Sequence, residues 1–259
     1  MNILFWNMNK KQNIKVTQEL LVENEIDVAI LAEYSDAGID KIIKQQGDSY
    51  IRHDGYGGCT KITLLAKNNY SIKVVREDAR FTIYVCSDGE SLFNIAGVHI
   101  PDRLHNGLLT RAECMRRLKE MIEQVEKQEN KDRTIIIGDF NANPTDMEMA
   151  GKSGLNAVLY SSLIQAKEEI NHGATKKKRL YNPILNYWKD EDGKRGSIYY
   201  DSDESLYWNC FDQVLLRRSL LTSFLSMNYC TRTQETNLMS KVKPNSKYSD
   251  HLPLVARFR

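Results

Sequence analysis

The sequence predicts a single α/β domain, spanning residues 1–259, that is built on more than one sheet. Apolar segments rich in β-branched and aromatic residues alternate with amphipathic segments of helical periodicity. No linker rich in Gly, Pro or Ser and no internal repeat interrupts this alternation. A chain of 259 residues can bury roughly 70% of the surface of its unfolded state, so its core needs no disulfide or metal.

Strands and a helix alternate in the first part of the chain. The short apolar run Asn2–Trp6 indicates a buried strand, and Val16, Leu20 and Leu21 follow it at helical spacing. The segment Asp27–Ala32 is a continuous apolar run after its first residue and indicates a second buried strand. Three further strands are predicted, separated by turn-forming Asn, Asp and Gly residues, at Ile62–Ala66, Phe81–Cys86 and Leu92–Ile100.

A long amphipathic helix is predicted in the middle of the chain. Thr110 and Glu113 have the spacing of a capping box, in which each side chain accepts a hydrogen bond from the backbone N–H of the other residue. Apolar residues recur behind this box at helical spacing, at Cys114, Leu118, Met121, Ile122 and Val125.

The second half of the chain returns to strands. The β-branched run Thr134–Ile137 predicts a strand that Gly138 ends, and Val214–Leu216 and Leu254–Phe258 predict the remaining ones. Between them, residues 167–205 are polar and charged. We expect a long surface excursion there, and loops of that length are usually functional or disordered.

The charge balance excludes one class of protein. Lys and Arg number 36, Asp and Glu number 34, and the formal net charge is +2. A polycation that holds nucleic acid by bulk charge is therefore excluded. If the protein handles phosphates, a local site must supply the attraction.

Targeting signals and cysteine usage favour a cytoplasmic protein. Lys10 and Lys11 follow the N-terminal apolar run instead of preceding it, which is the wrong order for a secretory signal. No segment approaches the roughly 18 apolar residues of a transmembrane helix. The 5 cysteines include no C-x-x-C pair, so neither a disulfide framework nor a zinc site is expected. A monomer is the default expectation.

The strongest local signal follows the strand at Thr134–Ile137. The next residues run from Gly138 through Asp139 and Asn141 to Pro144. Strand alternation points the side chains of Asp139 and Asn141 to one side, at the rim of a sheet. A carboxylate and an amide so placed can hold a nucleophilic water and a phosphate oxygen. A simple turn is the alternative, because Gly, Asp, Asn and Pro all form turns.

Polar residues also flank three other predicted strands. Asn7 follows the first strand, Glu33 follows the second, and Asp250-His251 precedes the last. Each alone is explained as a solvated strand end or a structural histidine. Together they supply carboxylates for a hard divalent cation, amides for orientation and a histidine for phosphate. Such oxygen ligands suit Mg²⁺ or Mn²⁺ far better than zinc.

These residues carry a resemblance that spans essentially the whole chain. In order and spacing, the sequence resembles the endonuclease/exonuclease/phosphatase superfamily, which includes deoxyribonuclease I-like nucleases, sphingomyelinases, inositol polyphosphate 5-phosphatases and deadenylases. The resemblance implies a four-layer α/β/β/α sandwich with two facing mixed sheets. The matching segments are Trp6-Asn7, Leu31-Ala32-Glu33, Val98-His99-Ile100, Gly138-Asp139-Phe140-Asn141, Phe211-Asp212-Gln213-Val214 and Ser249-Asp250-His251.

The resemblance also implies a metal site. Glu33 would ligate Mg²⁺, or Mn²⁺ in its place. Asp250 would lie at the metal, and Asn7 would orient groups near it.

The roles of the remaining site residues follow from the same resemblance. Asp139 would position or deprotonate the attacking water, and Asn141 would donate a hydrogen bond to the phosphate. His251 would contact the scissile phosphate, with Asp212 fixing its tautomer and raising its basicity. His99 matches a second phosphate-binding histidine.

Two departures from the family pattern bear on the mechanism. Members commonly have Gln before the metal-binding Glu, whereas this chain has Ala32. The deoxyribonuclease branch pairs its equivalent of His99 with a Glu, and no acidic residue occurs around Gly58–Ile62 to take that part. These departures argue against a mechanism with two charged histidines but not against metal-dependent hydrolysis.

Two groups of residues are candidates for substrate binding. Within 176–200, cations and aromatics alternate, a combination that suits phosphate pairing and base stacking. The alternative there is a solvated loop whose aromatics pack on the core. Arg103 and Arg111 form a second candidate group, although Arg111 can also be a helix surface position. The candidates in the first group are Lys176, Lys177, Arg179, Tyr181 and Trp188.

The sequence therefore predicts a Mg²⁺-dependent phosphoric ester hydrolase. A nuclease, endonuclease or exonuclease, acting on DNA or RNA is the leading hypothesis. The first alternative is a phosphatase or phosphodiesterase acting on a small or lipid-linked phosphoester. A non-catalytic binding module on the same fold is the third hypothesis, disfavoured because the expected catalytic positions are filled.

Overall fold

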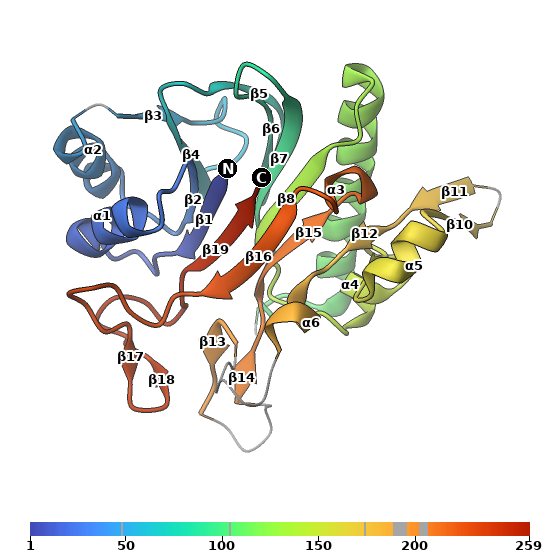
Figure 1. Cartoon of the computed structure of the whole chain (residues 1–259). Helices are drawn as coiled ribbons and strands as arrows, with labels where there is room; N and C mark the ends of the chain where they lie inside the picture. The colour runs from blue at the N-terminus through green and yellow to red at the C-terminus, as the bar shows by residue number, and fades with distance from the viewer. Residues whose placement is uncertain (48, 104, 174, 189–195, 202–206) are drawn as a thin grey trace.

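The computed structural model describes residues 1–47, 49–103, 105–173, 175–188, 196–201 and 207–259. Two large mixed sheets dominate the described residues (Figure 1). The first has six strands, in the order β16 (Phe224–Tyr229), β19 (Leu254–Phe258), β1 (Asn2–Asn7), β2 (Val28–Ala32), β4 (Ile62–Lys67) and β3 (Tyr50–His53).

The second large sheet has seven strands, in the order β5 (Ser71–Asp78), β6 (Phe81–Ser87), β7 (Leu92–His99), β8 (Thr134–Asp139), β15 (Asp212–Leu216), β12 (Leu180–Tyr181) and β9 (Ala157–Val158). Three two-stranded sheets also occur among the described residues. They are formed by β10 (Glu169–His172) with β11 (Thr175–Lys178), β13 (Ile198–Tyr199) with β14 (Trp208–Asn209), and β17 (Met239–Ser240) with β18 (Lys243–Pro244).

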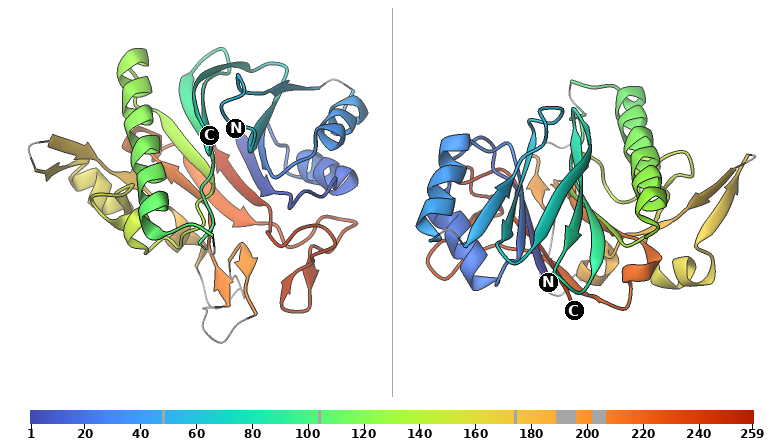
Figure 2. Two further views of the ribbon diagram at one scale, coloured as in Figure 1. Left: turned by 180° about the vertical axis from the view of Figure 1, so that it is seen from behind. Right: turned by 90° about the horizontal axis from the view of Figure 1, so that it is seen from above.

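Helices cover the outer faces of the two large sheets, which gives the predicted four layers. α1 (Ile14–Glu23) and α2 (Asp36–Gln45) lie outside the first sheet, and the long α3 (Leu108–Glu129) lies outside the second (Figures 1 and 2). The short helical segments are α4 (Met147–Ala150), α5 (Ser161–Ala166), α6 (Ile184–Tyr187) and the 3-10 turn Arg218–Leu220. Among the described residues, no helix combines the length and the apolar character that crossing a bilayer requires.

Strand alternation explains how one strand serves two cores. In β8, Ile135 and Ile137 belong to the apolar cluster that includes both sheets, whereas Ile136 belongs to the cluster beneath α3. Because successive strand residues point to opposite faces, a strand buried on both sides is an uninterrupted apolar run. This is the pattern from which the central strands were predicted.

Two details of the prediction need correction. α3 begins at Leu108 with Gly107 as its N-cap residue, so Thr110 lies inside the first turn and no capping box forms with Glu113. β8 does not end at Ile137 but continues through Gly138 to Asp139. At Gly138 φ is 154°, and an added Cβ would lie 2.1 Å from the carbonyl oxygen of Val98. Glycine therefore lets β8 stay paired with β7 instead of ending the strand.

The polar segment 167–205 is also more structured than expected. Its described residues form the β10–β11 hairpin, the short helix α6 and β12, and β12 is a strand of the second large sheet. β12 joins this sheet because its two residues, Leu180 and Tyr181, are apolar and become buried, although the surrounding sequence is charged. Residues 174, 189–195 and 202–206 of this region lie outside the described part.

A buried ion pair fastens α3 to the second sheet. Glu126 on α3 accepts hydrogen bonds from Nε and Nη2 of Arg217, at 2.8 and 3.0 Å, and from the hydroxyl of Thr134 at 2.7 Å. The side chains of Arg217 and Glu126 are 1% and 6% exposed. Removing one partner would leave the other charge buried without compensation.

We expect Arg217→Met to lower the free energy of unfolding by about 3–5 kcal/mol. Urea unfolding followed by circular dichroism measures this change, and Arg218→Met is the matched control because Arg218 is half exposed and pairs with Glu168 at 3.4 Å. The double variant Arg217→Met/Glu126→Leu should regain much of the loss, because no charge remains buried. Equal stabilities of the Arg217 and Arg218 variants would contradict the prediction.

Candidate active site

Strand register places three of the predicted site residues next to one another in the second sheet. β7 and β8 are parallel, with His99 opposite Asp139, and β8 and β15 are antiparallel, with Asp139 opposite Asp212. Neighbouring strands are about 4.8 Å apart. The three side chains therefore lie along one line across the end of the sheet.

The first sheet contributes two further groups from its own strand ends. β1 and β2 are parallel, with Asn7 opposite Ala32, and Glu33 follows directly with φ of 47°. The side-chain amide of Asn7 donates to Oδ2 of Asp139 at 3.2 Å. This buried hydrogen bond connects the two sheets at the site.

His251 is held by the backbone just before β19. The indole N–H of Trp6 donates to the carbonyl oxygen of His251 at 3.0 Å. Ser249 donates its hydroxyl to the carbonyl of Asn7 at 2.7 Å and accepts from the backbone N–H of His251 at 3.0 Å. Residues from the two ends of the chain thus fix each other's positions, because β1 and β19 are neighbours in one sheet.

The ring orientation of His251 is set by Asp212. Nδ1 of His251 lies 2.7 Å from Oδ2 of Asp212, and Nε2 lies 3.9 Å from Oδ2 of Asp139. Burial disfavours the charged imidazole, but the carboxylates of Asp212, Asp139 and Asp250 outweigh it and raise the pKa of His251 to about 10. The ring is therefore a proton donor whose Nε2 is directed away from Asp212.

Asp139 is the most enclosed carboxylate that lines the site. Its Oδ1 accepts the backbone N–H of Asn141 at 2.8 Å, and its Oδ2 accepts from Asn7. Burial raises the pKa of Asp139, and Asp212 acts in the same direction, while His251 and His99 oppose them. Asn141 has φ of 48° and donates one amide N–H to the carbonyl of Ile100 at 2.9 Å.

His99 faces the carboxylates through one ring nitrogen only. Nε2 lies 3.4 Å from Oε1 of Glu33 and 3.8 Å from Oδ2 of Asp139. The hydrogen bond between Glu33 and His99 lowers the pKa of Glu33 to about 2, although burial of the carboxylate opposes this shift. Nδ1 of His99 is buried and has no hydrogen-bond partner among the described residues.

These groups line one cavity of about 400 Å³. Of the residues predicted from the sequence, it brings together Asn7, Glu33, His99, Asp139, Asn141, Asp250 and His251, with Asp212 behind His251. Other residues of its wall were not predicted from the sequence, and most of them lie in the connections that follow or precede strands. They are Lys10, Tyr34, Thr60, Lys61, Arg80, Asp102, Ile198 and Tyr200. A usable signal was the position of Lys61, which directly precedes a predicted strand.

The donor set fits a hard divalent cation. Glu33 and Asp250 offer carboxylate oxygens at the cavity, and Asn7 offers an amide oxygen. Oxygen ligands of this kind suit Mg²⁺ and Mn²⁺. Ligand atoms of Asp139, Asp212 and His251 also lie within 4.8 Å of one another, but Asp212 and His251 already bond each other. The open oxygen-rich position therefore lies on the Glu33 side.

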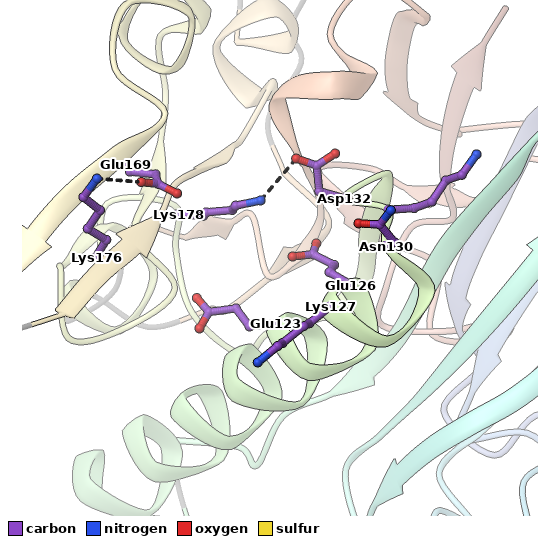
Figure 3. A pocket seen from close by; sticks show the side chains of 9 residues that line it. Glu123, Glu126, Lys127, Asn130, Asp132, Glu169, Lys176 and Lys178 are labelled. Carbon is purple, nitrogen blue, oxygen red and sulfur yellow. Dashed lines mark hydrogen bonds and ion pairs between the residues drawn. The ribbon is translucent and has the colours of Figure 1, made fainter.

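The basic residues of the polar segment lie elsewhere. Lys176 pairs with Glu169 at 3.8 Å and Lys178 with Asp132 at 3.2 Å, in a second cavity of about 530 Å³ beside the C-terminal end of α3 (Figure 3). Lys177 pairs with Glu123 of α3 at 3.9 Å. These cations are balanced by carboxylates, and they do not line the cavity that holds Asp139.

The other predicted members of that group make internal contacts. Arg179 donates to the carbonyl of Lys167 at 2.8 Å, and Tyr181 is buried in the core. The indole N–H of Trp188 lies 3.1 Å from the sulfur of Cys210. Tyr181 thus packs in the core, whereas Trp188 stays partly exposed, and neither lines the cavity that holds Asp139.

Arg103 and Arg111 do not face the cavity but hold its wall from behind. Nε of Arg103 and Nη2 of Arg111 both donate to the carbonyl oxygen of Asn141, at 2.8 and 2.9 Å. Arg111 also pairs with Glu148 at 2.6 Å and is 4% exposed. Arg111 is therefore neither a phosphate contact nor a helix surface position. It supports the backbone of Asn141.

Comparisons with known proteins agree with this architecture. No protein-family model and no curated protein matches the sequence. TDP2 from D. rerio, in a complex with a single-strand DNA product, has 15% identity and a TM-score of 0.64 over 100% of this chain and 98% of that chain. The human nocturnin catalytic domain with bound sulfate has 15% identity and a TM-score of 0.60, over 100% and 94%.

A mannosyl-6-phosphatase from Bacteroides thetaiotaomicron has 12% identity and a TM-score of 0.64, over 100% of this chain and 99% of that chain. A further similar structure, also from that organism, is described as an endonuclease/exonuclease/phosphatase family protein. At such identities the similarity establishes the fold. The chain therefore has the fold of the endonuclease/exonuclease/phosphatase superfamily, as its motifs predicted.

Proposed function

We propose that the protein is a divalent-metal-dependent phosphodiesterase that hydrolyses nucleic acid. The observation that carries the proposal is the joint placement of Asp139 and the Asp212–His251 pair beside Glu33, in one cavity. Hydrolysis of a phosphodiester needs a base for water, a donor for the phosphate oxygens and a cation. Asp139 can act as the base, the Asp212–His251 pair as the donor, and Glu33 as a ligand of the cation.

The protein's own groups divide the reaction between them. Asp139, whose pKa is raised by burial, accepts a proton from the attacking water. The water oxygen forms a bond to phosphorus as the bond to the leaving oxygen breaks. Nε2 of His251 donates to a phosphate oxygen, and Asp212 keeps the ring in that orientation. A bound Mg²⁺, held by Glu33 and Asp250, would neutralise charge on the phosphate and the leaving oxygen.

Unpaired cations at the rim favour nucleic acid as the substrate. Lys10, Lys61 and Arg80 line the cavity, and none of them forms an ion pair among the described residues. They suit a substrate with more than one phosphate. The similar TDP2 structure contains a single-strand DNA product. A small phosphoester is the second candidate, because about 400 Å³ is a volume typical of small-molecule sites.

A substrate panel tests the proposal. The purified chain is incubated with Mg²⁺, Mn²⁺ or EDTA and with single- and double-stranded DNA, RNA, abasic DNA, inositol phosphates or sphingomyelin. We expect a nucleic acid to be cleaved with metal and to stay intact with EDTA. Phosphate release from a small ester alone would support the second candidate. Turnover of no substrate would leave only the binding module.

A further inference from the structure

A glycine-rich loop closes around the carboxylate of Glu77. The loop, residues 54–61, connects β3 to β4, and Glu77 lies on β5. Its Oε2 accepts the backbone N–H groups of Tyr56 and Gly58 at 2.7 and 3.4 Å, and its Oε1 accepts that of Cys59 at 3.3 Å. One side chain of the second sheet thus holds a loop of the first.

Glycine makes this closure possible. An added Cβ at Gly55 would lie 1.5 Å from Oε1 of Glu77 and would displace the carboxylate. Gly57 has φ of 101°, a region that other residues rarely adopt. At the start of the loop, Asp54 accepts from the hydroxyl of Thr63 at 2.8 Å. The loop is therefore anchored along its length and is not a loose connection.

The anchored loop ends at the active-site cavity. Thr60 and Lys61 are exposed and line that cavity, and the next residue, Ile62, pairs with Ala32, which directly precedes Glu33. Among the described residues, no carboxylate forms an ion pair with Lys61. A hydroxyl and an unpaired ammonium next to each other are donors suited to a phosphate oxygen.

Strand order in the first sheet places Lys61 beyond the candidate metal ligand Glu33. β19, β1, β2 and β4 are successive neighbours, so His251, Asn7, Glu33 and Lys61 follow one another across the end of the sheet. Carboxylates of Glu33, Asp139 and Asp250 line the same cavity. The scissile phosphate belongs there, between the candidate metal ligands and His251. Thr60 and Lys61 lie on the side of Glu33 that is away from His251, and Lys61 forms no ion pair among the described residues, so its ammonium group is available to a second anionic group of the substrate.

We propose that Thr60 and Lys61 bind a second, non-scissile phosphate of the substrate, and that Glu77 is the positioning residue that holds them in place. This inference rests on the proposed phosphodiesterase function. The second phosphate can come from the next nucleotide of a strand or from a doubly phosphorylated small molecule. Both present the same anionic oxygens.

Kinetics on matched substrates test the subsite. Lys61→Ala should raise KM for a short oligonucleotide about tenfold, with kcat within about twofold, because the lost contact is made equally in ground and transition states. With bis(p-nitrophenyl) phosphate, which has one phosphate, KM should change less than about twofold. Lys73→Ala is the control, since Lys73 is exposed on β5. A dinucleotide and a nucleoside 3′,5′-bisphosphate, compared as competing ligands, distinguish the two sources.

A double-mutant cycle tests the role of Glu77. Glu77→Ala should raise KM in the same substrate-dependent way, and Glu77→Gln less, because an amide oxygen still accepts hydrogen bonds. The pair Lys61→Ala/Glu77→Ala should raise KM by clearly less than the product of the two single effects, since Glu77 acts in part through the contact that Lys61→Ala has already removed.

Additive effects, or equal losses on the one-phosphate substrate, would overturn the inference and indicate a general structural role. If Glu77→Ala does not fold, Glu77→Gln and Lys61→Ala complete the same comparison. A parent chain that hydrolyses the oligonucleotide without any effect of Lys61 would refute the subsite alone. A parent chain that hydrolyses neither substrate would refute the proposed function as well.

Discussion

Asp139→Asn is expected to fold like the parent chain and to lose at least about 10³-fold in kcat. Asp139 is the buried carboxylate between the two sheets, and its oxygens accept from Asn141 and Asn7. An amide of the same shape preserves the packing but cannot accept a proton from water. The loss should therefore fall on kcat more than on KM.

Single-turnover and steady-state assays on the nucleic acid that the parent cleaves measure this loss. The matched control is Asp132→Asn, because Asp132 is a half-exposed carboxylate that pairs with Lys178 in the second cavity. Circular dichroism and a thermal melt check that both variants fold. A kcat for Asp139→Asn within tenfold of the parent would exclude Asp139 as the base.

Removing the divalent cation is expected to abolish turnover, and Glu33→Gln to weaken the response to it. The hydrogen bond with His99 lowers the pKa of Glu33 to about 2, so this carboxylate is ionised at neutral pH and available to a cation. Glutamine keeps the shape without the charge. We expect the Mg²⁺ concentration at half-maximal activity to rise about tenfold or more, since one charged ligand is lost.

Two measurements separate metal binding from chemistry. Activity is recorded against free Mg²⁺ after EDTA treatment, and the melting temperature is recorded at the same concentrations. A cation that binds the folded state stabilises it, so Mg²⁺ should raise the melting temperature of the parent more than that of Glu33→Gln. Glu90→Gln is the control, because Glu90 is exposed in a turn. Full activity in EDTA would contradict the proposed metal dependence.

Much of the fold was predictable because its signals are local. The uninterrupted run Thr134–Ile137 is a strand buried on both faces, and alternation divides its isoleucines between two cores. The capping box at Thr110 failed because Gly107 already starts the helix with a suitable extended backbone. The end of a helix depends on which of a few neighbouring residues becomes the N-cap, whereas a continuous apolar run indicates a buried strand without such a choice.

The structure places the predicted substrate residues of the polar segment outside the active-site cavity, for a different reason. Lys176 and Lys178 form a basic sequence run, but Glu169 and Asp132, their ion-pair partners, come from other elements. A charge pattern in sequence does not reveal which carboxylates the fold brings to it. Lys61, in contrast, stands alone in sequence and lines the cavity without an ion-pair partner among the described residues.

Local sequence was sufficient to identify the strands and the polar residues at their ends, because side-chain alternation is a property of the backbone itself. It was also sufficient to name Asp139 and His251 as site candidates. Their neighbours required the folded chain. Arg111 turns inward to the carbonyl of Asn141, 30 residues away, and Glu77 holds a loop 18 to 21 residues before it. Such contacts arise from packing between sheets and helices, which no local pattern encodes.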